Sequence, residues 1–164
     1  MKISPVIKGL ITVVLMIAIF LLIFYSGKKT DARFQYSVFL VYALGICWTL
    51  FAYRQSAAFT GKFGDLFGQG FRCFVVVTLV IAIFYGIFNY LHPELIEEQA
   101  TLFRKQILES VAKKDRLPTD IEPEIATFKK QFTLRLVSSA IFGYLIIGAG
   151  VTAVLSALLT RRTK

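Results

Sequence analysis

The residues best suited to acid–base chemistry stand together just beyond the middle of the chain. His92, the single histidine of the sequence, is followed by Pro93 and Glu94. An imidazole beside a carboxylate can serve as a proton relay or a pH sensor, because histidine changes its charge near neutral pH. A simpler interpretation, which we favour, places His92 at the end of one helix and lets Pro93 and Glu94 begin the next.

The sequence lacks the common catalytic and binding signatures. With one histidine, the chain cannot form an HExxH zinc motif or another site with several histidines. It contains no CxxC pair, no GxSxG turn, no Walker A loop and no GxGxxG loop. Cys47 and Cys73 stand apart in apolar surroundings, where cysteine usually behaves as a small hydrophobic residue. We therefore expect no catalytic residue, no metal, no cofactor and no enzyme activity.

Four long stretches of the sequence carry no charged side chain. They cover residues 9–27, 34–53, 73–91 and 136–160. At about 1.5 Å of rise per residue, each stretch covers roughly the 30 Å hydrocarbon thickness of a bilayer as a helix. Their continuous apolar character also excludes the alternating pattern of barrel strands. The predicted fold class is all-α: a polytopic membrane protein with four transmembrane helices.

We expect a single four-helix membrane domain over residues 1–164, with spans at about 5–27, 34–53, 71–91 and 134–160. Glycine and phenylalanine alternate in the connection at residues 54–72. Because glycine costs roughly 1 kcal/mol relative to alanine in a helix, this connection is predicted to be short, irregular and interfacial. Gly64 and Gly68 match the small-xxx-small dimer pattern weakly, since they lie outside the apolar stretches.

Residues 92–133 form the predicted extramembrane insert. Apolar residues recur there at helical spacing in two stretches, separated by Leu117 and Pro118. This periodicity predicts an amphipathic helical hairpin between the third and fourth spans, with its second helix running into the fourth span. The apolar positions are Ile96, Ala100, Phe103, Ile107 and Val111 in the first stretch, and Ile121, Ile125, Phe128 and Phe132 in the second.

Small residues mark one side of the fourth span. Small side chains let membrane helices approach closely, so these positions are candidates for helix packing. We favour packing within the chain, and a protein partner subunit or a homo-oligomer through this helix is the open alternative. The candidates are Ser139, Gly143, Ala149, Ala153 and Ala157.

The net charge of +9 does not indicate nucleic-acid binding. Eight basic and eight acidic residues cancel between residues 92 and 135, and the other eleven lysines and arginines lie at helix ends and in short loops. This distribution is typical of proteins that contact anionic lipid head groups. The expected partners therefore include membrane lipids and exclude nucleic acid.

The leading functional hypothesis is a non-enzymatic membrane scaffold or accessory subunit. Catalytic and ion-coordinating groups are missing from the sequence, whereas a small-residue face and a predicted hairpin are present. One alternative is a small transporter or channel, in which Thr78, Asn89 and the hydroxyls of the fourth helix would line a polar path closed by the hairpin. A second is a lipid-binding membrane protein with a cavity beneath the hairpin. The last is an enzyme acting on lipid head groups, with His92 and Glu94 among its acid–base groups.

Several motifs along the chain occur together in a known family. They are the opening at residues 2–10, Tyr53-Arg54 after the second span, the Gly/Phe segment at residues 63–71, and Pro93-Glu94 after the third span. With the charged insert and the small-residue fourth helix, they give a chain that resembles domain-of-unknown-function family 4199, the small four-helix membrane proteins of Bacteroidota.

The resemblance implies a multi-pass protein of the bacterial inner (cytoplasmic) membrane and implies no activity or catalytic residue. The numbers of lysines and arginines near the span ends are almost equal on the two sides of the membrane. The resemblance then favours cytoplasmic termini and a periplasmic insert.

Overall fold

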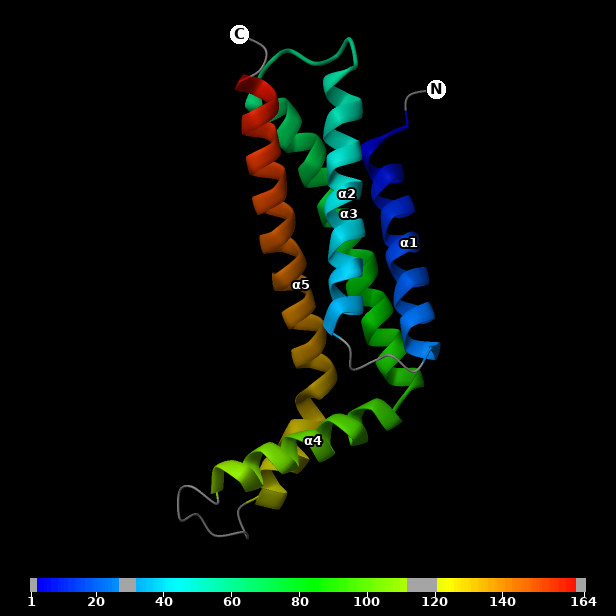
Figure 1. Ribbon diagram of the computed structural model, residues 1–164, viewed down its shortest axis with the longest axis vertical. Helices are drawn as coiled ribbons and strands as arrows, with labels where there is room; N and C mark the ends of the chain where they lie inside the picture. The colour runs from blue at the N-terminus through cyan, green and yellow to red at the C-terminus, as the bar shows by residue number, and fades with distance from the viewer. Residues whose placement is uncertain (1–2, 27–31, 112–120, 162–164) are drawn as a thin grey trace. The chain divides into compact units, whose positions relative to one another are not determined.

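The computed structural model describes residues 3–26, 32–111 and 121–161. Within these residues the chain is mainly helical, as predicted, and its helices are drawn in Figure 1. They are α1 (Pro5–Tyr25), α2 (Ala32–Arg54), α3 (Phe63–Leu91), α4 (Glu94–Val111) and α5 (Ile121–Arg161). Two compact units divide the chain: the bundle unit, Met1–Ile81 with Ala140–Lys164, and the insert unit, Ala82–Ser139.

Four of these helices, α1, α2, α3 and α5, are long and apolar enough to cross a membrane. Their outward side chains are large and apolar: Val14 is 63% exposed, Leu40 61% and Ile146 71%. In water such surface would be unfavourable, whereas in a bilayer it faces lipid tails. The prediction of four spanning helices is confirmed, and the chain has the architecture of a multi-pass membrane protein.

The bundle unit is held together by close approaches between helices at small residues. A Cβ atom added at any of four glycines would collide with a neighbouring helix. Close backbone approach is the main source of packing energy between membrane helices, because lipid tails compete equally well for apolar side chains. The four contacts are Gly9 against Cys73, Gly45 against Thr12, Gly70 against Thr152, and Gly148 against Tyr42 and Phe74.

The connection between α2 and α3 is shorter than predicted. The chain is irregular over residues 55–62, where the Tyr53 hydroxyl donates to the Ala58 carbonyl at 3.1 Å and Gly61 has a φ of 82°. The prediction of an irregular segment is wrong from Phe63 onward, because α3 already begins there. Packing of Gly70 against Thr152 offsets the low helix propensity of the glycines.

The insert unit contains the end of α3, α4 and the first turns of α5. Its core consists of Ala100, Ile121 and Ile125, with Phe103, Ile107 and Phe128 packed against them. The rings of Phe103 and Phe128 stack at a centroid distance of 4.3 Å. The predicted break at Leu117-Pro118 lies outside the described residues.

Helix α5 is continuous over 41 residues and contributes to both units. At 1.5 Å per residue it is about 60 Å long, roughly twice the hydrocarbon thickness of a bilayer. Pro123 lies in its first turn, where the missing N–H leaves no intrahelical hydrogen bond unmade. The prediction that the second apolar stretch of the insert runs into the fourth span is confirmed.

Replacing Gly148 with alanine will destabilise the bundle unit by about 1–3 kcal/mol, the usual cost of overpacking. The added Cβ meets the Cβ of Phe74, so rotation of the phenylalanine ring cannot relieve the clash. Gly150→Ala is the matched control, because nothing lies within 4 Å of its Cβ position. Unfolding midpoints in detergent measure both effects, and an equal change in the two variants would contradict the packing described here.

Candidate functional site

The polar side chains inside the bundle unit bond mainly to their own helices. The hydroxyls of Thr12 and Thr49 donate to the carbonyls of Lys8 and Gly45, at 2.8 and 2.9 Å. Thr78 is 1% exposed and donates to the Phe74 carbonyl at 2.8 Å. Hydroxyl groups in packed membrane helices commonly bond in this way. These side chains stabilise a packed interior and leave Thr78 without a free donor for a passing solute.

One polar contact in the bundle unit joins two helices that are far apart in the sequence. The Tyr42 hydroxyl of α2 donates to the Tyr144 carbonyl of α5 at 2.8 Å, and the two rings meet edge to face at 5.2 Å. The bond is buried at both ends, since Tyr42 is 0% and Tyr144 3% exposed. Tyr42 therefore fixes the register between α2 and α5.

The buried ridge of α5 is offset from the one the sequence indicated. Tyr144, Gly148, Thr152 and Ser156 recur every four residues, and all are buried. The hydroxyls of Thr152 and Ser156 have no hydrogen-bond partner. The sequence analysis assigned smaller residues to the buried ridge. The tyrosine at the same four-residue spacing was the signal that could have identified the observed ridge.

The structure places the predicted packing residues around that ridge. Ala149, Ala153 and Ala157 are half-buried, each one residue after a member of the ridge. Gly143 has nothing within 4 Å of its Cβ position. Ser139 is exposed and belongs to the insert unit. Their role in binding another subunit stays a prediction.

Three of the predicted polar residues lie near the junction of α3 and α4, and two of them are in contact. His92 Nδ1 and Glu94 Oε1 are hydrogen-bonded at 2.7 Å, and the rings of His92 and Phe88 lie 4.4 Å apart. Asn89 is 4% exposed and its amide donates to the Tyr85 carbonyl at 2.9 Å. These contacts fit the end of one helix and the start of the next. The fourth candidate, Thr78, belongs to the bundle unit.

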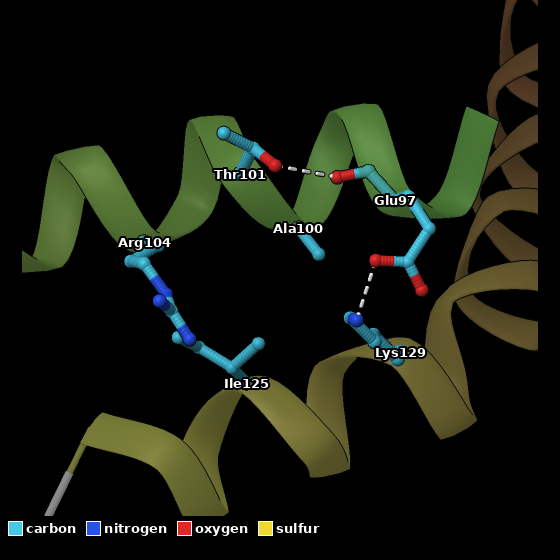
Figure 2. Close-up of a pocket in the computed structure, with 6 residues that line it drawn as sticks. All are labelled: Glu97, Ala100, Thr101, Arg104, Ile125 and Lys129. Atoms are coloured by element: carbon cyan, nitrogen blue, oxygen red, sulfur yellow. Dashed lines mark hydrogen bonds and ion pairs between the residues drawn. The ribbon is translucent and has the colours of Figure 1, made fainter. Parts of the chain in front are cut away.

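A cavity of about 250 Å³ lies between α4 and the start of α5, within the insert unit. Figure 2 shows Lys129 reaching across to the Glu97 carboxylate, at 2.6 Å, and Arg104 lining the same cavity. Arg104 also pairs with Glu122 at 2.5 Å. Of these two ion pairs, the one with the higher residue number on α4 has the lower residue number on α5. The two helices therefore run antiparallel. Exposed pairs of this kind contribute roughly 0–1 kcal/mol each to stability.

Two further observations bear on the identity of the chain. Among the described residues, no group of three or more His, Cys, Asp or Glu side chains is placed to hold a metal ion. The family described as a protein of unknown function, DUF4199, matches residues 8–162. The chain belongs to this family. No curated protein and no solved structure matches it. DUF4199 membership confirms the resemblance found in the sequence, and its description assigns no activity.

Lys8 of this DUF4199 chain stands in the first turn of α1, at a helix end as the sequence predicts. Its burial was not predicted, since it is only 7% exposed. Its Nζ is 5.6 Å from the centre of the Trp48 ring, a distance that allows a cation–π interaction. Lys8, Thr12 and Met16 recur every four residues and are all buried.

Replacing Ile125 with alanine will open the insert unit of this DUF4199 protein. We expect a loss of about 2 kcal/mol or more, because a buried isoleucine at this position contacts the core of the hairpin. Glu97→Gln is the control, and it should cost only about 0.5 kcal/mol because its carboxylate is largely exposed. Hydrogen exchange of the α4 amides measures both. A larger effect from Glu97→Gln would show that the ion pairs hold the hairpin together.

Proposed function

We propose that this DUF4199 protein is a non-enzymatic scaffold or accessory subunit of the bacterial inner membrane. The observation that carries the proposal is an uncovered small-residue face on α5. Gly143 and Gly150 lie two turns apart on one side of the helix, and neither has an atom within 4 Å of its Cβ position. Gly148, on another side, is packed tightly inside the bundle unit.

An uncovered glycine face on a membrane helix suits a second helix better than it suits lipid. Small residues let another backbone approach to van der Waals distance, where dispersion and Cα–H···O contacts accumulate. Ile146 lies between the two glycines and is 71% exposed, so it could pack over the edge of such a partner. The partner would be another protein subunit or a second copy of this chain.

The transporter and channel alternative requires Thr78, Asn89 and the hydroxyls of α5 to line a polar path. The Thr152 and Ser156 hydroxyls are buried and have no hydrogen-bond partner, an observation in its favour. Thr78 and Asn89 instead donate to carbonyls of their own helix, at 2.8 and 2.9 Å. The scaffold role therefore accounts for more of the surface.

A photocrosslinking probe on this face should capture a protein in native membranes. We expect benzoylphenylalanine in place of Ile146 to form a protein adduct of defined mass. Gly150→Leu in the same chain should abolish that adduct by blocking close approach. The same probe at Val14, which is 63% exposed on α1, serves as the control and should capture lipid. Lipid adducts alone at both positions would contradict the proposal.

We also propose that the termini face the cytoplasm and the insert faces the periplasm. Support comes from the basic residues at the end of the bundle unit where α1 begins and α5 ends, and Figure 1 shows that these two helix ends lie at the same end of the unit. Short loops rich in lysine and arginine stay on the cytoplasmic side. The basic residues at this end are Lys8, Arg54, Lys62, Arg72 and Arg161.

Reporter fusions test this orientation directly. A fluorescent protein fused after residue 164 should fluoresce, and alkaline phosphatase fused there should be inactive, because each folds on one side of the membrane. Alkaline phosphatase inserted within residues 112–120 should be active. The opposite pattern of activities would place the insert in the cytoplasm.

A further inference from the structure

A groove of about 340 Å³ opens on the bundle unit between the ends of α2 and α5. Phe51 of α2 lines one side, and Leu155, Leu158 and Leu159 of α5 line the other. Leu159 is only 4% exposed, whereas Phe51 is 46% and Leu158 55% exposed. The groove therefore has a buried floor and an open, apolar side.

The remaining lining residue of the groove is a cation. Arg161, the last residue of α5, is exposed and lines the groove together with the leucines. Arg54 ends α2 at the same end of the unit, where α5 also ends. Asp65, a carboxylate at this end, is hydrogen-bonded to the Thr60 hydroxyl. An apolar groove thus ends at a guanidinium at the level where lipid head groups lie.

We propose that this groove binds one anionic phospholipid. An acyl chain lies against Phe51, Leu155 and Leu158, and the lipid phosphate pairs with Arg161. A guanidinium presents a planar set of donors that matches two phosphate oxygens, and such charge-assisted pairs are strong. The site does not depend on the scaffold role, and it stands whether or not α5 also binds a protein.

The charge of Arg161 also makes the other possible occupants of this apolar groove less favourable. A neutral helix seated here would cover Arg161 without supplying an opposite charge, which is costly in a low-dielectric setting. A second copy related by two-fold symmetry would bring the same residues to both sides of the contact, including both arginines. A phospholipid supplies an apolar chain and a negative charge in one molecule.

Native mass spectrometry of the full chain in detergent can measure the binding. The probes are dioleoyl phosphatidylglycerol and dioleoyl phosphatidylcholine, which share their acyl chains and differ in net charge. We expect the anionic lipid to bind about fivefold more tightly, the preference that one basic residue near a membrane surface typically confers. Arg161→Gln should remove that preference. Arg72→Gln removes a charge from an exposed residue at the same end and should retain it.

A second variant separates the groove from surface charge. Leu158→Trp fills the groove and should weaken binding of both lipids while leaving their ratio unchanged. Unfolding midpoints confirm that each variant is folded. Equal affinities for the two lipids, or equal losses from Arg72→Gln and Arg161→Gln, would overturn the proposal. So would unchanged binding in Leu158→Trp, or a dimer whose formation displaces lipid from the groove.

Discussion

The bundle unit depends on how closely α5 can approach α2 and α3 at Gly148. At this point the Tyr42 hydroxyl and the Phe74 side chain occupy the space that a Cβ atom would need. One turn earlier, the same tyrosine donates its hydroxyl to the Tyr144 carbonyl. In lipid, apolar side chains gain little by leaving the solvent, so helices associate through close fit and interhelical hydrogen bonds. Both interactions require glycine at position 148.

The insert unit is stabilised by a different set of interactions. Its core consists of the apolar residues Ala100, Ile121 and Ile125, and its ion pairs lie on the outside. The bundle unit places large apolar side chains outside as well, and its interior combines apolar residues such as Met16, Ile46 and Leu50 with glycines and hydroxyl side chains. One chain therefore follows two rules of packing, and α5 contributes to both units. This difference accounts for the distinct compositions of the spans and the insert.

The four spans were predictable because an apolar run without charge that is long enough to cross a bilayer is rare outside membrane helices. The start of α3 was not, since local propensity disfavours helix at Gly64, Gly68 and Gly70, and packing within the bundle unit, such as that of Gly70 against Thr152, offsets that preference. The ridge of α5 was predicted with small residues, and the structure includes Tyr144 in it. Which side of a membrane helix faces its neighbours depends on those neighbours, and a single apolar sequence carries little information about them.

The candidate site was likewise only partly predictable from the sequence. The junction of His92 with Glu94 was predictable from their adjacency in the sequence, whereas the groove beside Phe51 and Arg161 joins residues more than a hundred positions apart. Sequence periodicity describes one helix at a time. Sites formed between helices, including the buried position of Lys8 beside Trp48, require the fold.

The mass of the intact particle, extracted with its surrounding lipid by a membrane-solubilising polymer, tests the scaffold account most directly. The account predicts a complex of fixed stoichiometry, containing either another protein or further copies of this chain. A single chain accompanied only by lipid, across extraction conditions that preserve known complexes, would contradict it.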